Sequence, residues 1–379
     1  MMRRGGRRAS CAGSTFLLAV WFAGALAAQD LPESHICIEA STGAVLYEQN
    51  ADLSRPPASM VKLMMLLLAS EGLDAELWRE DAPIAISAHA QHMGGTQVYV
   101  ESGQTWPLNH LMQAVAVASA NDAAMAVAEG LWGSEEAYLE AANRRAAELG
   151  MTNTEYHSVH GLPPDPGTPI DRTTARDMSV LARECVKHPR LLAWTQRKEF
   201  EFRPGQALCY NTNKMLWCMP ECDGLKTGFI RASGYCVTAT AVRGDTRLIV
   251  VVMGSPRFGE RFETARTLLE TGFSQVQRVK VAGAGQPVRR TVKVAHGKKP
   301  EAALHAGDDI WVLVPPGRAG QLRVVVDVPE SVEAPVKAGD VAGELWVELD
   351  EKPLGNTLLF VTEAVPVDLW SLVTAGGSM

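Results

Sequence analysis

Two residues three positions apart, Ser59 and Lys62, could together carry out acyl transfer. At positions i and i+3 of a helix they share a face, so the amine can reach the hydroxyl. A serine hydroxyl becomes a good nucleophile only when a base takes its proton, and a lysine is a base only when its amine is neutral. The apolar run KLMMLLLAS would bury the amine, and Lys226 would add a neighbouring positive charge. The sequence therefore predicts Ser59 as the nucleophile and Lys62 as its base.

A second short motif, Ser119-Ala120-Asn121, offers groups that could assist the same reaction. The Ser119 hydroxyl can relay a proton between the lysines and a leaving amine. Asn121 offers both a donor and an acceptor to a substrate amide. We therefore predict that Ser119 is catalytic and that Asn121 binds substrate.

The third motif, Lys226-Thr227-Gly228, lies in the β-like run DGLKTGFI. Lys226 and Thr227 can bind a substrate carboxylate, while Gly228 lets a substrate backbone come close. The backbone N–H groups of Ser59 and Phe229 are natural donors to the oxyanion of a tetrahedral intermediate. This triplet arises by chance in about one such chain in ten, so all three motifs in this order form a strong combined signal.

The elements around the motifs predict an α/β domain with its terminal strands in one sheet and a helical insert between them. Residues 35–50 alternate like a hairpin. Residues 107–130, 134–149 and 173–187 have helical patterns, the first with a break at the S-x-N triplet. Three β runs and a helix over 260–271 complete the unit.

After Phe273 the pattern changes to short alternating strands separated by turns. This predicts a small C-terminal all-β domain of sandwich or barrel type. The predicted division of the chain is a signal peptide over 1–28, a catalytic domain over 29–273, a β domain over 274–364 and a tail over 365–379.

The N-terminus has the pattern of a secretory signal. Four arginines among the first eight residues precede the apolar run FLLAVWFAGALAA, which is too short to span a bilayer comfortably. The A-L-A triplet places cleavage near Ala28, with an uncleaved anchor as the alternative. We therefore expect an exported, periplasmic or extracytoplasmic protein. The net charge of -7 argues against nucleic acid as a partner.

Six cysteines follow the predicted cleavage site, and an even number suits disulfides in an oxidising compartment. We expect at least one bridge among Cys209, Cys218 and Cys222. Zinc is the alternative interpretation, although no C-x-x-C pair is present. Two closely spaced histidine pairs lack a matching acidic pattern, so we expect neither a metal nor a cofactor.

The segments PPASMVKLM, VASANDAAMAVAE and DGLKTGFIRASGYCVTATA resemble the three active-site motifs of the penicillin-binding D-alanyl-D-alanine carboxypeptidases. TGAVLYEQNAD, HGL, NTN and RLIVVVMGS are also similar to that family, over roughly residues 35–273 closely and over the β domain loosely. The resemblance implies the fold of penicillin-binding transpeptidases and β-lactamases, a helical cluster on a five-stranded antiparallel sheet. It also implies removal of the terminal D-alanine from the peptidoglycan stem pentapeptide, with β-lactams as covalent inhibitors. Arg261, in RFGERFE, is implied to assist carboxylate recognition.

Three positions depart from the family's pattern and leave substrate preference open. Val61 stands where the family often has threonine, Ala120 where it often has glycine, and Phe229 where a polar residue is common. A peptidoglycan D,D-endopeptidase or a β-lactamase is the alternative function, and a non-catalytic cell-wall-binding module is a third. The stretch EYHSVHGLPPDPGTP lacks the glutamate pattern typical of a β-lactamase's deacylating base.

Members of this family often end in a basic amphipathic helix that lies on the inner membrane. Here the end is VPVDLWSLVTAGGSM, which contains apolar residues but no lysine or arginine. Without basic residues the attraction to anionic lipid is missing, so the sequence gives only weak support for peripheral membrane association.

Overall fold

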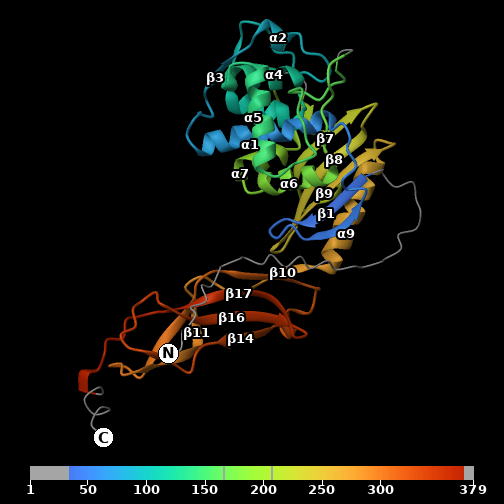
Figure 1. The fold of residues 1–379 in the computed structure, drawn as a ribbon. Helices are drawn as coiled ribbons and strands as arrows, with labels where there is room; N and C mark the ends of the chain where they lie inside the picture. The colour runs from blue at the N-terminus through green and yellow to red at the C-terminus, as the bar shows by residue number, and fades with distance from the viewer. Residues whose placement is uncertain (1–33, 165–166, 206–207, 371–379) are drawn as a thin grey trace, which may run out of the picture. The chain divides into compact units, whose positions relative to one another are not determined.

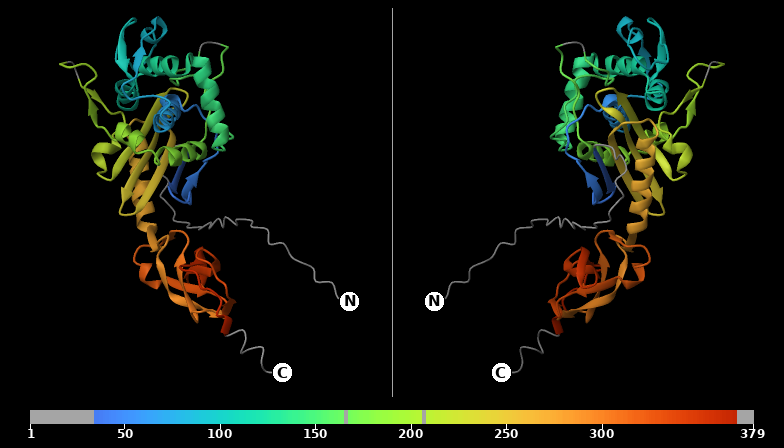
Figure 2. Two further views of the ribbon diagram at one scale, coloured as in Figure 1. Left: turned by 90° about the vertical axis from the view of Figure 1, so that its left-hand side faces the viewer. Right: turned by 90° about the vertical axis from the view of Figure 1, so that its right-hand side faces the viewer.

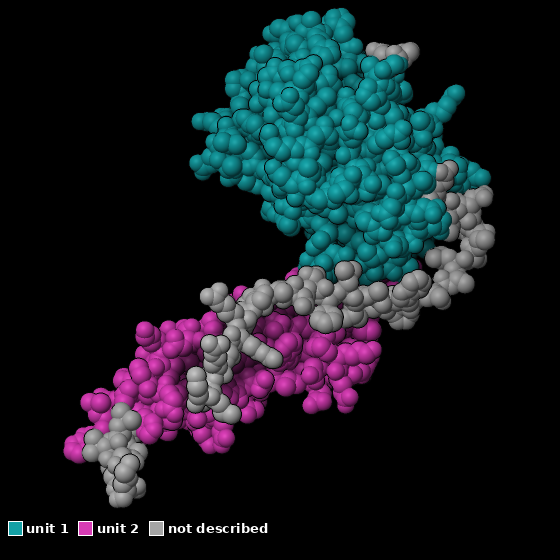
Figure 3. All heavy atoms as spheres, in the orientation of Figure 1, with its two compact units in different colours: residues 1–242, 247–269 teal, residues 243–246, 270–379 magenta. Residues whose placement is uncertain are grey.

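The computed structural model describes residues 34–164, 167–205 and 208–370. The chain forms two compact units (Figure 3). Residues 270 onward and the short segment 243–246 belong to the second unit, and the described residues before them and between them belong to the first. The predicted signal peptide lies outside the described residues. In the three described ranges, none of the helices is long and apolar enough to cross a membrane.

The first unit is built on a five-stranded sheet with the order β2-β1-β9-β8-β7. Its strands are β1 (Ser34–Glu39), β2 (Val45–Gln49), β7 (Cys222–Ile230), β8 (Gly234–Arg243) and β9 (Thr246–Ser255). β1 pairs antiparallel with β2 and β9, and β7 pairs antiparallel with β8. The predicted hairpin and the predicted union of the terminal strands are confirmed, and β7 lies at the edge of the sheet.

Both faces of this sheet are covered, which explains why β9 is a continuous apolar run rather than an alternating one. Ile249 belongs to the large core shared with the helices, whereas Val250 points the other way and is equally buried. On that second face lies α9 (Glu260–Gln275) (Figure 1). The carbonyl of Leu268 in this helix accepts from the Cys37 thiol at 3.8 Å.

The helical insert follows β2 in the sequence and covers the first face of the sheet (Figure 2). Its helices are α1 (Lys62–Asp74), α2 (Ala88–Gln91), α3 (Leu108–Val117), α4 (Asn121–Trp132), α5 (Glu135–Glu148), α6 (Ala175–Cys185), α7 (Pro189–Thr195) and α8 (Met215–Cys218). Two small hairpins accompany them, β3 (Pro83–Ala85) with β4 (Thr105–Pro107), and β5 (Glu199–Phe200) with β6 (Cys209–Tyr210). Ten of the 13 residues of α1 are buried, so this helix runs through the core, as its apolar sequence predicts.

The second unit is an all-β domain, as predicted. Its strands are β10 (Gln277–Ala282), β11 (Pro287–Ala295), β12 (Glu301–Ala306), β13 (Ile310–Val314), β14 (Arg323–Asp327), β15 (Ser331–Glu333), β16 (Val341–Leu349) and β17 (Lys352–Val361). A six-stranded sheet has the order β14-β16-β17-β12-β11-β15, and β10 pairs with β13 in a second sheet. Alternating apolar side chains from both sheets, such as Val292 and Val312, form one core between them, which is packing of the sandwich type.

The described cysteines are all free thiols, which corrects the expectation of at least one disulfide. Cys37, Cys185 and Cys236 are fully buried on three different elements, and burial raises the pKa of each thiol. The Cys222 thiol donates to a backbone carbonyl two residues away at 3.2 Å, while Cys218 is exposed. The buried cysteines act as small apolar core residues, which an even count does not reveal.

Candidate active site

Ser59 lies in a 3-10 turn, η1 (Ala58–Val61), which leads directly into α1 at Lys62. The Lys62 Nζ donates to the Ser59 Oγ at 3.2 Å. Lys62 is fully buried, whereas Ser59 is partly exposed and can be reached by a substrate. The structure therefore brings the predicted nucleophile and base together, as their spacing predicts.

The Lys62 amine is surrounded by oxygen atoms from three different segments. Besides Ser59, it donates to Asn121 Oδ1 at 2.7 Å and to the His160 backbone carbonyl at 3.0 Å. The Ser59 hydroxyl lies 3.4 Å from the same carbonyl. These contacts hold the amine in one position beside the Ser59 hydroxyl.

The charge state of Lys62 follows from its surroundings. Burial lowers the pKa of Lys62 well below its ordinary value, and the positive charge of Lys226 lowers it further. The carboxylates of Asp171 and Asp122 raise this pKa by smaller amounts. Burial and the charge of Lys226 thus make the Lys62 amine easier to deprotonate than an exposed lysine, and the deprotonated amine is the form that a base requires.

The second motif forms the break between two helices. α3 ends at Val117 and α4 begins at Asn121, as the sequence predicts, and Ser119 between them has a φ of +62°. Its hydroxyl oxygen is buried and, among the described residues, has no hydrogen-bond partner. Backbone strain and unpaired buried polar groups both cost free energy, and they gather at functional sites. The Ser119 hydroxyl is thus available to exchange a proton with a bound substrate.

Asn121 has protein partners on both ends of its side-chain amide. The oxygen accepts from Lys62, and the nitrogen donates to the Gly94 carbonyl at 2.7 Å. A Cβ atom at Gly95 would lie 2.6 Å from the same nitrogen. A glycine at this position therefore lets the 94–96 segment lie close to the Asn121 side chain. Each end of an amide has one further hydrogen-bonding position, which leaves room for the predicted contact with substrate.

Lys226 on β7 is the second fully buried lysine of the site. Its amine donates to the Thr227 carbonyl at 3.2 Å. Burial, followed by the positive charge of Arg261, lowers the pKa of Lys226 to about 7. A buried ammonium group with few negative charges around it is strongly stabilised when a carboxylate binds beside it.

Gly228 has a structural role in addition to the predicted contact with substrate. A side chain at this position would meet the Pro57 carbonyl oxygen at 2.5 Å and the Ala58 Cβ at 3.2 Å. The glycine therefore lets the turn that carries the nucleophile pack against β7.

Arg261 approaches β7 from α9, on the second face of the sheet. Its Nη1 donates to the carbonyls of Gly228 and Cys236, each at 3.1 Å. Burial lowers the pKa of Arg261 to about 10. These contacts tie the Arg261 guanidinium to the backbone beside the third motif and fix the position of β7 there.

The carbonyl that holds Lys62 belongs to the 157–161 loop, which a buried carboxylate fixes in place. Asp171 accepts from the N–H groups of His157 and Ser158 at 2.7 and 2.9 Å, and from the Ser158 hydroxyl at 2.7 Å. Asp171 is 3% exposed, so the charge that it carries acts in a poorly solvated setting.

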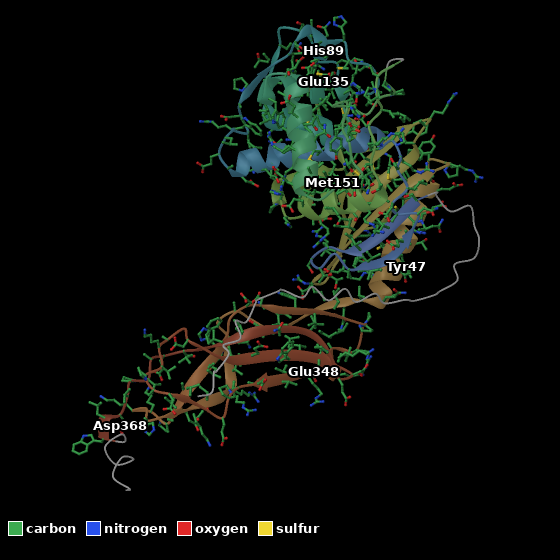
Figure 4. The ribbon with its side chains drawn as sticks, viewed as in Figure 1. Tyr47, His89, Glu135, Met151, Glu348 and Asp368 are labelled. Carbon is green, nitrogen blue, oxygen red and sulfur yellow. The ribbon has the colours of Figure 1, made fainter. Side chains whose placement is uncertain are left out.

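A second carboxylate and the ring of His160 complete this loop. Glu135, labelled in Figure 4, lies at the start of α5. Its carboxylate accepts from the Val159 N–H at 3.3 Å. Burial, with the charges of Lys62 and His89, lowers the pKa of His160 to about 4. The imidazole of His160 is therefore neutral at neutral pH.

Sequence reasoning missed several groups that position the three motifs. His160 contributes a carbonyl rather than its ring, and Asp122 accepts from two N–H groups of the 98–100 segment at 3.1 Å. The Thr212 hydroxyl pairs with that of Thr227 at 2.7 Å. Two of these groups belong to His160 and Thr212, which lie in the segments HGL and NTN. The only sequence signal for them is the resemblance of these segments to the family.

Gly161 allows the loop to approach the nucleophile. Its φ is +75°, and a Cβ would lie 2.1 Å from the Ala58 carbonyl oxygen. Gly150 has a φ of +77°, yet nothing lies within 4 Å of its Cβ position. We expect Gly150→Ala to cost only the backbone strain of about 1–2 kcal/mol. Gly161→Ala should cost more and should slow acylation at least about tenfold, because a shift of about 1 Å near the reacting atoms is costly.

Urea unfolding and the rate of labelling by fluorescent penicillin measure the two effects. Equal losses of stability and equal labelling rates in the two variants would show that the contact with Ala58 does not matter.

Among the described residues, one cluster has its side chains close enough to hold a metal ion: Glu71, Glu184 and His188. The Arg145 guanidinium lies 2.6 Å from the Glu71 carboxylate and 3.8 Å from that of Glu184. An arginine thus already compensates these charges, so the cluster is an ion-pair network. It shares no residue with the three motifs.

Comparison with known proteins adds independent evidence. Residues 25–257 match the family described as D-alanyl-D-alanine carboxypeptidase, and residues 277–367 match the penicillin-binding protein 5 C-terminal domain. The chain is 32% identical to D-alanyl-D-alanine carboxypeptidase DacF of Bacillus subtilis over 329 residues, which is 86% of this chain and 83% of that one.

Two solved structures extend the comparison. Penicillin-binding protein 5 from Haemophilus influenzae is 26% identical with a TM-score of 0.76, over 90% of this chain and 100% of that one. Penicillin-binding protein D2 from Listeria monocytogenes, in its ampicillin-bound form, is 31% identical with a TM-score of 0.58, over 64% of this chain and 97% of that one.

The fold and these similarities define a penicillin-binding, serine-type hydrolase. The chain belongs to the family of D-alanyl-D-alanine carboxypeptidases. The predicted fold class and the predicted D,D-carboxypeptidase are thereby confirmed, and the endopeptidase alternative has less support.

Proposed function

We propose that Ser59 attacks the carbonyl carbon between the two terminal D-alanines of a peptidoglycan stem pentapeptide. The observation that carries this proposal is the buried Lys62 amine, with its lowered pKa, 3.2 Å from the Ser59 Oγ. As the new C–O bond forms, the hydroxyl proton passes to Lys62. The backbone N–H groups of Ser59 and Phe229 stabilise the oxyanion.

In the second half of acylation the C–N bond breaks, and the leaving amine of D-alanine takes a proton. The Ser119 hydroxyl relays this proton from Lys62, since it is buried and has no other partner among the described residues. Asn121 holds Lys62 and offers its remaining N–H to the substrate amide. Water then hydrolyses the ester on Ser59, with Lys62 again acting as base.

The carboxylate of the terminal D-alanine is held by Lys226 and Thr227. Lys226 supplies a buried positive charge and Thr227 a hydroxyl on the edge strand β7. Arg261 contributes positive charge from behind this strand. A site built for a carboxylate loses these pairings when the end of the peptide is uncharged.

A β-lactam carries both a reactive carbonyl and a carboxylate, so it enters the same site. The relative from Listeria monocytogenes is known in an ampicillin-bound form, which supports this proposal. In the described residues, the Ser59 hydroxyl bonds to the Lys62 amine and the His160 carbonyl, and no carboxylate contacts it. Without a dedicated deacylating carboxylate, the penicilloyl enzyme should persist for minutes or longer.

The test compares a pentapeptide ending in D-Ala-D-Ala, its C-terminal amide, and penicillin. We expect release of D-alanine from the acid, much slower cleavage of the amide, and a stable penicilloyl adduct on Ser59 by mass spectrometry. Rapid penicillin turnover without release of D-alanine would instead indicate a β-lactamase.

The pH dependence of the acid-to-amide preference should report on Lys226. Its pKa is lowered to about 7, so the amine is charged below that pH and neutral above it. Attraction of the substrate carboxylate is therefore present at lower pH and is lost as pH rises through about 7. Deprotonation of Lys62 affects both substrates alike and cancels in the ratio of their kcat/KM values. An acid-to-amide ratio that stays constant from pH 5.5 to 8.5 would contradict the role of Lys226.

The cell-wall family to which the chain belongs supports a location outside the cytoplasm. We propose that residues 1–28 direct export and that the mature chain contains a catalytic domain over 29–273, a β domain over 274–364 and a tail over 365–379. N-terminal sequencing of the secreted protein, with a start near Ala28 or Gln29, tests the export signal.

A further inference from the structure

A row of aromatic side chains begins beside the third motif. Phe229 on β7 and Tyr235 on β8 face each other in the strand register, and their rings stack with centroids 4.2 Å apart. Phe258 and Phe262 continue the row, at centroid distances of 6.0 Å and 5.6 Å. We call these four residues the aromatic row.

Two rings of this row are unusually open to solvent for their size. Phe229 is 51% exposed and Phe258 is 50% exposed. Both rings lie in one contiguous row rather than singly on the surface. Exposed aromatic surface of this kind marks a place where a ligand makes contact.

The aromatic row is held rigid from behind. The Arg261 guanidinium lies 5.2, 4.8 and 4.5 Å from the ring centroids of Tyr235, Phe258 and Phe262. The same guanidinium is anchored to two backbone carbonyls of β7 and β8. Rings that are already fixed lose little conformational entropy when a ligand covers them, which favours binding.

Strand geometry places Phe229 beside the carboxylate site. Side chains at positions i and i+2 of a strand share a face, so Phe229 stands on the same face of β7 as Thr227, about 7 Å further along. β7 is the edge of the sheet, where an extended peptide can pair with the strand. A terminal residue whose carboxylate meets Thr227 therefore has its side chain within reach of the Phe229 ring.

We propose that Phe229, supported by Tyr235, contacts the side chain of the residue that is removed, so that the enzyme accepts an aromatic D-amino acid in place of the terminal D-alanine. This inference rests on the proposed function. The methyl group of D-alanine covers little of a ring, whereas the side chain of D-phenylalanine can stack on Phe229 and bury apolar surface.

The chemistry is unchanged from that of D-alanine. The Ser59 Oγ forms a bond to the carbonyl carbon of the penultimate D-alanine, and the C–N bond to D-phenylalanine breaks. The leaving amine takes the proton that came from Ser59, and one water molecule then hydrolyses the ester.

The test measures kcat/KM for two pentapeptides, one ending in D-Ala-D-Ala and one in D-Ala-D-Phe. We expect the wild-type enzyme to release D-phenylalanine. The ratio of the two kcat/KM values, D-Phe over D-Ala, should fall at least about tenfold in Phe229→Thr, since a lost apolar contact is typically worth 10–200-fold. Phe229→Tyr keeps the ring and should keep the ratio.

Two further variants sharpen the result. Tyr235→Leu removes the ring that supports Phe229 and should also lower the ratio, which provides a second measurement if Phe229→Thr folds poorly. Trp217→Ala removes another exposed aromatic, 44% exposed on α8, and should leave the ratio unchanged. Thermal unfolding and penicillin labelling check that each variant is folded.

The outcomes separate this inference from the proposed function. If folded wild-type enzyme cleaves neither peptide, the proposed function fails and this inference fails with it. If D-alanine is released but D-phenylalanine is not, or if Phe229→Thr leaves the ratio unchanged, the inference alone is overturned.

Discussion

Ser59→Ala is expected to abolish covalent labelling by fluorescent penicillin and to lower the release of D-alanine about 10⁴-fold or more. The acyl intermediate forms on the Ser59 oxygen, and the rest of the site cannot replace that atom. Stability should change little, because within the described part of the chain this hydroxyl contacts only Lys62 at 3.2 Å and the His160 carbonyl at 3.4 Å.

Ser179→Ala is a matched control for this variant. Ser179 lies on α6 in the same unit, and its hydroxyl donates to the Arg176 carbonyl at 2.7 Å. It should label as fast as wild type. Full labelling of folded Ser59→Ala, with the adduct mapped to another residue, would show that Ser59 is not the nucleophile.

Lys62→Arg is expected to slow acylation about 10³-fold or more, because a guanidinium does not lose its proton in a protein and cannot act as the base. The wild-type lysine can do so because burial and the charge of Lys226 lower its pKa. Burst kinetics with penicillin measure acylation separately from later steps.

Arginine is larger than lysine, and position 62 is fully buried, so a second variant is needed. Lys62→Met keeps a similar length without a charge or a basic nitrogen, so it should fold and still fail to acylate. Lys187→Met, on an exposed lysine paired with Glu184, is the control. Acylation by either position-62 variant within tenfold of the wild-type rate would show that Lys62 is not the base.

Much of the fold could be predicted because its signals are local. The hairpin over 35–50, the break between α3 and α4, and the all-β character of the second unit follow from periodicity and turn residues. The expectation of a disulfide was wrong, since cysteine spacing does not show which thiols meet in space.

In the candidate site, too, the local features could be predicted from the sequence and the long-range contacts could not. The spacing of Ser59 and Lys62 on one helical face is a local property, so the sequence could indicate their pairing. The packing role of Gly228 depends on Pro57, which is far away in the sequence. Only the tertiary structure shows that a Cβ at position 228 would lie 2.5 Å from the Pro57 carbonyl oxygen.

By itself, the sequence determined which functional groups are available: two lysines, two serines, an asparagine and a threonine in three short motifs. Only the tertiary structure decided their charge states and their additional partners. The pKa of Lys62 depends on burial by the whole core and on Lys226 from a distant strand. The carbonyl of His160 is directed at Lys62 by Asp171, whose hydrogen bonds join separate segments. Both effects arise from long-range packing, because desolvation and the distances between charges determine the electrostatic energies. Neither effect produces a periodic pattern in the sequence.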